Sequence, residues 1–175
     1  MNRVFGKISE FALVRQDASC TAVAYDYKPE PDGENATWCE VIINRLHPSF
    51  SEVKDAIIRD VNARTTALII AGFDYKVKHG KQKGTKVKVW LSSANQQDFH
   101  AMHQNADGLD FPVRYKIGEL EGGTPVYEEF ADAEEMHDVC KLTASHILAC
   151  QQAGWAEKDA IDWTPYEEAL DPEVE

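Results

Sequence analysis

The sequence predicts an α+β fold in which β-hairpins pack with two longer helices, at about residues 49–71 and 132–152, and one short helix at about 93–106. Two observations support this prediction. Short runs of alternating apolar and polar residues recur on either side of Gly-, Pro- or Asp-containing turns, which is typical of antiparallel hairpins. Between them lie segments whose apolar residues recur every three or four positions behind a Ser or Asp, which is typical of capped amphipathic helices.

Residues 1–46 are predicted to be a β-rich segment. Apolar and aromatic residues alternate over 21–27, a Pro-, Gly- and Asp-containing turn follows at 29–35, and a second alternating run covers 37–43. Strand, turn and strand in this order predict a hairpin.

Residues 47–163 are predicted to form the main α+β domain, followed by an acidic C-terminal tail at 164–175. The last ten residues of the chain are expected to be frayed or available to a partner. The first helix begins at Ser49 and Glu52, which have the spacing of a capping box. Its predicted apolar stripe contains Val53, Ile57, Val61, Leu68 and Ala71.

Two further hairpins are predicted at 73–92 and 111–130, with the short helix between them. Asp132 and Glu135 form a second capping pair before the long helix, and Gly154 is predicted to end that helix. Serine at position 92 or 93 is the expected cap of the short helix.

The chain has 175 residues, 18 of them basic and 30 acidic, for a formal net charge of −12. This length suits one domain of ordinary size, or one with a small appendage, and 43% hydrophobic residues can form a core without disulfides or a structural metal. The acidic balance argues against whole-surface binding to nucleic acid or to an anionic membrane, because both are polyanions. A local basic patch is not excluded.

Six lysines and no acid lie between Tyr75 and Gln97. Four of them are expected to share one face of the hairpin at 73–92, by the two-residue period of a strand. This pattern indicates either a ribbon that contacts phosphates or a solvated face that protects an edge strand. The candidate anion-binding residues are Lys76, Lys78, Lys81, Lys83, Lys86 and Lys88.

The histidines and cysteines do not form a recognisable metal-binding motif. His100 and His103 are three residues apart, as are Glu134 and His137, but no HExxH or CxxC pattern completes a ligand set. We therefore predict no metal and no cofactor, with histidines that face solvent. The four cysteines, which we expect to be free thiols in a reducing cytosol, are Cys20, Cys39, Cys140 and Cys150.

No catalytic motif is present in the sequence, which lacks a GxSxG elbow, a Walker A loop and a GxGxxG loop. The acids from Glu128 to Asp138 are interpreted mainly as capping a helix start. A catalytic site built from these acids and His137 is kept as a third hypothesis, but we predict that the chain is not an enzyme.

The N-terminus has no apolar run of signal-peptide length, and the longest apolar stretch, residues 67–71, is too short to span a bilayer. We expect a protein that is made and kept in the cytosol, unless it leaves as part of a larger particle, and that has no membrane partner.

Several short motifs occur along the chain in an order and at a spacing that resemble the pattern of a known family. They are Val61-Asn62-Ala63-Arg64, Ala71-Gly72-Phe73-Asp74-Tyr75, Val89-Trp90-Leu91-Ser92-Ser93-Ala94-Asn95-Gln96, Phe111-Pro112-Val113, Gly123-Thr124-Pro125-Val126-Tyr127 and Gly154-Trp155-x-x-Lys158-Asp159. Over about residues 53–162 the chain resembles a domain family of unknown function that is common in bacteriophages and prophages and often encoded near tail and tail-fibre genes. The long lysine-rich turn departs from the family pattern, which usually has a short turn at this place.

The resemblance implies a non-enzymatic structural or assembly factor of a phage tail or tail fibre, acting through protein–protein contacts. It also implies a location in the host bacterial cytosol or association with the virion. The β-rich segment at 1–46 lies outside the resemblance and is a candidate for binding a larger partner. The candidate partner-binding residues are Trp38, Trp90, Trp155 and Trp163. The alternative hypothesis is a nucleic-acid-binding module that uses the Lys76–Lys88 hairpin. The acidic tail is also expected to suit contact with this hairpin, either in the same chain or in a second copy, and the second case would give a homo-oligomer.

Overall fold

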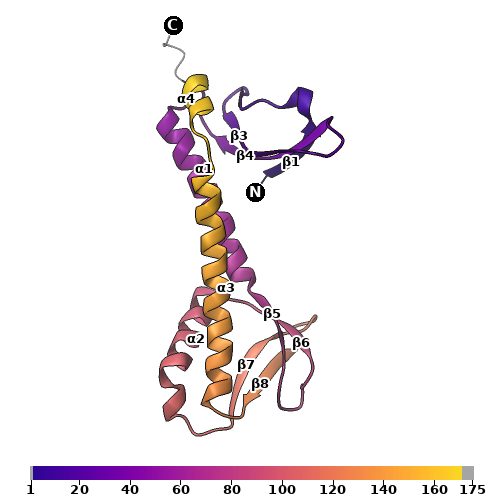
Figure 1. The fold of residues 1–175 in the computed structure, drawn as a ribbon, viewed down its shortest axis with the longest axis vertical. Coiled ribbons are helices and arrows are strands. Elements are labelled where there is room, and N and C mark those ends of the chain that lie inside the picture. The colour runs from indigo at the N-terminus through magenta and orange to yellow at the C-terminus, as the bar shows by residue number, and fades with distance from the viewer. Residues whose placement is uncertain (1, 171–175) are drawn as a thin grey trace. The chain divides into compact units, whose positions relative to one another are not determined.

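The computed structural model of this chain describes residues 2–170 and confirms the α+β fold. Over these residues the chain forms two antiparallel four-stranded sheets and four α-helices (Figure 1). The elements in chain order are β1 (Asn2–Lys7), the 3-10 turn η1 (Ile8–Glu10), β2 (Val14–Gln16), β3 (Thr21–Pro29), β4 (Asn35–Ile43), α1 (Phe50–Ala71), β5 (Phe73–Lys76), β6 (Lys86–Val89), α2 (Ser93–Asn105), the 3-10 turn η2 (Ala106–Gly108), β7 (Val113–Glu119), β8 (Pro125–Phe130), α3 (Ala133–Asp159) and α4 (Thr164–Leu170).

The chain divides into two compact units. Unit 1 contains the residues up to Arg64 and those from Gly154 onwards, and unit 2 contains Thr65–Ala153. This division does not follow the segments 1–46, 47–163 and 164–175 expected from the sequence. The reason is that the first half of α1 and the chain after Gly154 pack on the first sheet, so each unit is described separately below.

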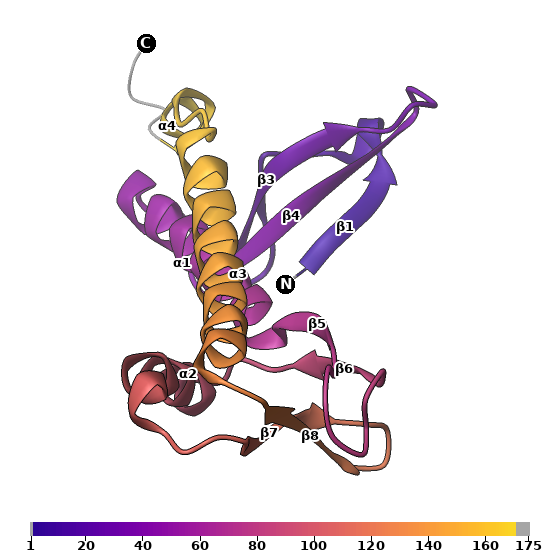
Figure 2. The ribbon, with the colours of Figure 1, turned by 60° about the horizontal axis from the view of Figure 1, so that its bottom comes forward.

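In unit 1 the strands are ordered β1-β4-β3-β2, and Figure 2 shows β1, β4 and β3 side by side. The predicted hairpin is β3 and β4. The N-terminal half of α1 covers one face of the sheet, where the buried side chains are Val23, Tyr25, Cys39, Val41, Val53, Ala56, Ile57, Val61 and Tyr166. The predicted capping box holds the start of this helix, because Ser49 N–H donates to the Glu52 carboxylate at 2.8 Å and Glu52 N–H donates to the Ser49 hydroxyl at 3.3 Å.

The opposite face of the same sheet has a small core around Trp38. Its indole packs edge-on against Phe11, with 5.4 Å between ring centroids, and lies so close to Gly6 that a Cβ there would be 2.9 Å from the ring. Ala24 and Ala36 complete this core. Glycine at position 6 therefore makes room for the tryptophan.

In unit 2 the strands are ordered β5-β6-β7-β8, so both predicted hairpins are present. The two hairpins are joined at one register pair, Lys88 with Glu119. Gly118 allows this close approach, because a Cβ there would lie 2.5 Å from the Val87 side chain. The core of unit 2 contains Tyr75, Val77, Val87, Val89, Leu91, Phe99, Ala106, Ile117, Val126, Phe130, Met136, Val139 and Cys140.

The two later helices begin where the sequence predicts. Asn95 N–H donates to the Ser92 hydroxyl at 3.2 Å and caps α2, and Glu135 N–H donates to the Asp132 carboxylate at 2.9 Å at the start of α3. The prediction that Gly154 ends the second long helix is wrong. Helix α3 continues through Gly154 to Asp159. Gly154 is buried where this part of the helix packs in unit 1, and a residue without a side chain suits a buried helix face.

The expected frayed tail is also wrong for its described part. Residues Thr164–Leu170 form α4, and Tyr166 is buried among the side chains of the first sheet. Asp162 starts this turn by accepting a hydrogen bond from Thr164 N–H at 3.0 Å. The remaining residues of the predicted tail, 171–175, lie outside the described part of the chain.

The apolar stripe predicted for the first helix is correct only in its first half. Val53, Ile57 and Val61 are buried, whereas Leu68 and Ala71 are exposed. No helix among residues 2–170 combines the length and the apolar character needed to cross a lipid bilayer.

Candidate functional site

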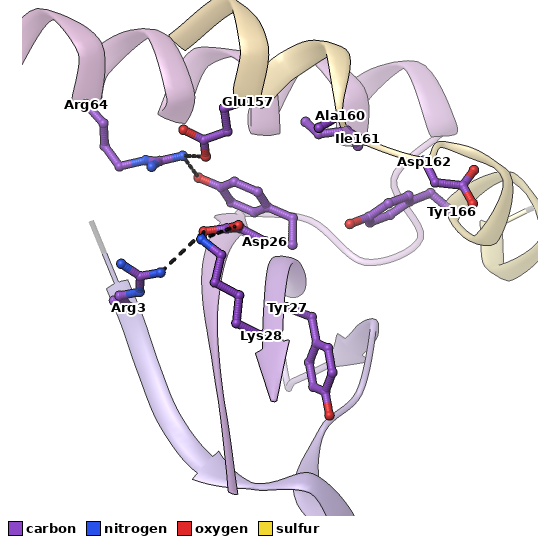
Figure 3. A pocket seen from close by; sticks show the side chains of 11 residues that line it. Arg3, Asp26, Tyr27, Lys28, Arg64, Glu157, Ala160, Ile161, Asp162 and Tyr166 are labelled. Atoms are coloured by element: carbon purple, nitrogen blue, oxygen red, sulfur yellow. Dashed lines mark hydrogen bonds and ion pairs between the residues drawn. The ribbon is translucent and has the colours of Figure 1, made fainter. Parts of the chain in front are cut away.

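A cleft of about 550 Å³ lies within unit 1, between the sheet and the chain around the end of α3 (Figure 3). Strands β1 and β3 form one wall, and α1, the end of α3 and α4 form the other. Its volume is in the range of ligand pockets and of clefts that accept a peptide segment. The charged side chains that line it are Arg3, Asp26, Lys28, Arg64, Glu157 and Asp162.

A bulge in β3 positions the carboxylate of Asp26 in this cleft. The ladder to β4 pairs Tyr25 with Cys39 and then Lys28 with Thr37, so β3 has one extra residue at this point. Asp26 takes up the extra length with a φ of 52°, a left-handed conformation that is rare for a residue with a side chain. Lys28 donates to its carboxylate at 3.0 Å and Arg3 donates to it at 3.4 Å, as the dashed lines of Figure 3 show.

The floor of the cleft is a network around the hydroxyl of Tyr25. This hydroxyl donates to the Asp60 carboxylate and accepts a 3.0 Å hydrogen bond from the Arg64 guanidinium, which also donates to Asp60 and to Glu157. Burial, and then the hydrogen bond to Asp60, hold the pKa of Tyr25 far above its ordinary value. The phenol therefore stays protonated, and the network joins β3, α1 and α3 within unit 1.

The second phenol of the cleft, Tyr166, is also fully engaged. Its hydroxyl donates to the Ala24 carbonyl at 2.9 Å, and burial raises its pKa to about 12. Both phenol hydroxyls and the Asp26 and Glu157 carboxylates already have partners in the protein. The exposed charged groups of the cleft are Asp162 and the two partners of Asp26, Arg3 and Lys28, whose side chains are 45% and 60% exposed. This arrangement can bind a polar or anionic segment, with hydrogen-bond donors at the rim and aromatic rings at the floor.

The lysines predicted as an anion site lie in unit 2, on β5, β6 and the loop between them. Lys76 and Lys86 are directly opposite each other on the exposed face, and Lys88 lies opposite Asp74, to which it forms a 2.9 Å salt bridge. Lys81 and Lys83 are exposed in the loop.

Lys78 does not share this face, in contrast to the sequence prediction. Strand β5 ends at Lys76, and the ammonium of Lys78 lies 3.9 Å from Asp138 of α3. Because β5 ends two residues before Lys78, the alternation of side chains between the two faces of a strand does not extend to this residue.

The carboxylate of Glu128, which is fully buried, fixes the base of the lysine-rich loop. It accepts hydrogen bonds from the Tyr75 hydroxyl at 2.8 Å, from Lys78 N–H at 2.7 Å and from His79 N–H at 2.8 Å. Burial, and then the bond to Glu128, keep the pKa of Tyr75 well above its ordinary value.

The side chain of Gln82 connects the same loop to β8. Its amide oxygen accepts from Tyr127 N–H at 2.9 Å, and its amide nitrogen donates to the Pro125 carbonyl at 3.1 Å. The side chain thus takes the place of the backbone N–H and C=O groups that a neighbouring strand would offer to β8. The lysine-rich loop is therefore held by two sets of hydrogen bonds, those to the buried Glu128 carboxylate and those between the Gln82 side chain and the backbone of β8.

The other acids near the start of α3 have structural roles. Burial favours the protonated form of Glu135, but hydrogen bonds from Ala131 N–H and from the His79 ring outweigh it, so the pKa of this carboxyl lies below its ordinary value. His137, at the centre of the third hypothesis, has its Nδ1 2.9 Å from that of His103 and its Nε2 3.4 Å from Asp107. Among residues 2–170, no three His, Cys, Asp or Glu side chains gather as ligands for a metal ion.

The four tryptophans have different surroundings. Trp38 is 5% exposed and belongs to the small core of the first sheet, and Trp163 is half-buried against Phe50. Trp90, at the end of β6, and Trp155, on α3, are 56% and 51% exposed. Only these two of the four predicted partner-binding residues present most of an indole to solvent.

Comparison with family models, with curated proteins and with solved structures gave no match. The phage-family resemblance remains a prediction from the motifs quoted above.

Sequence reasoning missed the cleft and the basic residues of β7. Arg3, Asp26, Arg64 and Glu157 are far apart in the chain, and no local pattern connects them. Arg114 and Lys116 do have a signal, because they alternate with Val113, Tyr115 and Ile117 and so are expected on the face of β7 away from the core.

Proposed function

We propose that this chain is a non-enzymatic binding protein that acts through protein–protein contacts as a structural or assembly factor of a bacteriophage tail or tail fibre. The cleft of unit 1 carries the binding part of the proposal. The motif resemblance over residues 53–162 supports the phage-tail part of the proposal and a location in the host cytosol or in the virion.

The chemistry of the cleft favours binding a protein segment. Its floor contains two buried tyrosine rings and its rim contains Arg3, Lys28 and Asp162, a combination of aromatic and arginine side chains that is enriched at protein interfaces. The acids and phenols are already engaged with protein partners, which suits a preformed surface that changes little on binding.

Binding to the tail proteins encoded by neighbouring genes tests this proposal. Each is purified and its affinity for the full-length chain is measured by biolayer interferometry. Replacing both accessible cations, Arg3→Glu with Lys28→Glu, should weaken binding to the true partner by about tenfold or more, the range of an interface hot spot.

Lys7→Glu is the matched control, since Lys7 is an exposed cation on the same strand as Arg3 but does not line the cleft. It should change the affinity by less than about twofold. Failure of the unaltered chain to bind any of these tail proteins, or an equal loss in the control, would refute the proposal.

A further inference from the structure

The outer face of the unit 2 sheet is more basic than the lysine-rich hairpin alone. Inward side chains of the four strands form the core, so their neighbours in sequence project from the other face. The cations on that face and its loop are Lys76, Lys81, Lys83, Lys86, Lys88, Arg114 and Lys116, and the acids are Asp74, Glu119 and Glu129. Seven cations against three carboxylates leave a positive surface on a protein whose total charge is negative.

More than half of these cations have no salt bridge within the described part of the chain. Lys88 pairs with Asp74, and Lys116 pairs with Glu119. No salt bridge joins Lys76, Lys81, Lys83 or Lys86 to any of residues 2–170. Lys76 and Lys86 are opposite one another in the ladder, where like charges repel unless an anion lies between or over them.

Two aromatic side chains lie among these cations. Trp90 lines a hollow of about 160 Å³ with Lys116, Gly118 and Glu119. The Arg114 guanidinium lies 3.8 Å from the ring centroid of Tyr127, and both residues line a second hollow, of about 270 Å³, with Lys81 and Glu129. The positions of the loop cations are set in advance by the Glu128 and Gln82 hydrogen bonds described above.

We propose that the outer face of the unit 2 sheet binds single-stranded nucleic acid, with the lysines contacting phosphates, Trp90 stacking on one unpaired base, and the Arg114 guanidinium, which lies on the Tyr127 ring, stacking on another. Basic grooves that contain exposed aromatic rings bind single strands in this way, and each stacked base contributes about 1–3 kcal/mol. A duplex would hide its base faces from Trp90 and from the Arg114–Tyr127 pair, so these residues favour the single strand. This surface is separate from the cleft of unit 1, and the inference does not depend on the proposed tail function.

Fluorescence anisotropy of a labelled twelve-nucleotide oligothymidine with the full-length chain tests the proposal, at about 20 mM and about 150 mM salt. Binding should be measurable at the lower salt and weaken at the higher. Trp90→Ala should weaken it about tenfold, and Lys76→Glu with Lys86→Glu by about thirtyfold or more.

The controls are Trp155→Ala, an equally exposed tryptophan in unit 1, and Lys141→Glu, an exposed lysine on α3. Both should bind like the unaltered chain, and circular dichroism confirms that all variants are folded. No binding at the lower salt, or equal losses in the controls, would overturn the proposal. So would equal affinity for a duplex of the same length, which would indicate backbone contacts alone, or for a poly-glutamate peptide, which would indicate an acidic protein partner.

Discussion

Gly72 and Gly84 show how much the surroundings of a single residue matter. Both have left-handed backbone conformations, with φ of +66° and +88°. A Cβ on Gly72 would lie 1.6 Å from the Val89 carbonyl oxygen, whereas one on Gly84 would meet nothing within 4 Å. Gly72 ends α1 where Leu91 N–H donates to the Ile70 carbonyl at 3.0 Å, so this close contact fastens the helix end to the chain after β6.

Gly72→Ala should lower the free energy of unfolding of unit 2 by more than about 3 kcal/mol, because backbone must move to admit the methyl group. Gly84→Ala should cost only about 1 kcal/mol, the penalty of the left-handed conformation alone. Urea denaturation followed by circular dichroism gives both values. Equal losses in the two variants would contradict the steric explanation.

At the scale of elements, the loop at 77–85 is held by a buried acid and not by its own turn residues alone. Backbone bonds between Val77 and Thr85 and between Gly84 and Val77 close it, and the Glu128 carboxylate accepts the N–H groups at its base. A loop with so many lysines is thereby kept in one conformation despite the repulsion between its charges.

Glu128→Ala leaves the Tyr75 hydroxyl and several backbone N–H groups without their acceptor in a buried site. The free energy of unfolding should fall by about 3–5 kcal/mol, since each unsatisfied buried donor costs about 1–3 kcal/mol. Glu121→Ala, in the exposed turn before β8, removes the same charge and should change stability by less than about 0.5 kcal/mol. Comparable effects of the two substitutions in urea denaturation would show that the charge, and not the hydrogen bonds, is what matters.

At the scale of the whole molecule, segments distant in the sequence combine to form unit 1. Residues 2–64 supply the sheet and half of α1, and the chain from Gly154 to Leu170 packs on them through Tyr166. The hydrogen bond from the Tyr166 hydroxyl to the Ala24 carbonyl connects these segments.

The raised pKa of Tyr166 makes its contribution to stability depend on pH. The folded state holds the phenol proton more tightly, with a pKa of about 12 against an ordinary value of 10.0. Its stabilisation is therefore complete below pH 10 and is lost as the pH rises from 10 to 12, by about 3 kcal/mol in total, since each pKa unit corresponds to about 1.36 kcal/mol. Tyr166→Phe should be about 1 kcal/mol less stable at pH 8, from the lost hydrogen bond, and the difference should close above pH 10. Urea midpoints at pH 8, 10 and 11 measure it, and a constant difference across this range would contradict the argument.

Local patterns predicted most elements of this fold and part of its candidate sites. The capping pairs Ser49–Glu52 and Asp132–Glu135 lie within one helical turn, so their residue types alone specify the helix starts. Gly154 has the residue type of a helix end, yet the helix continues through it because its environment is the interior of unit 1.

The sequence by itself determined the α+β class, both hairpins of unit 2, the starts of its helices and the position of the lysine-rich loop. These features depend on alternation, helical period and capping, which act over a few residues. Only the tertiary structure decided that Arg114, Lys116 and Trp90 join the lysines on one face, that Glu128 is buried beneath their loop, and that Arg3, Asp26, Arg64 and Glu157 line one cleft. The reason is that these groups come from separate elements, whose pairing and packing are set by burial of the whole core and not by any local run of residues.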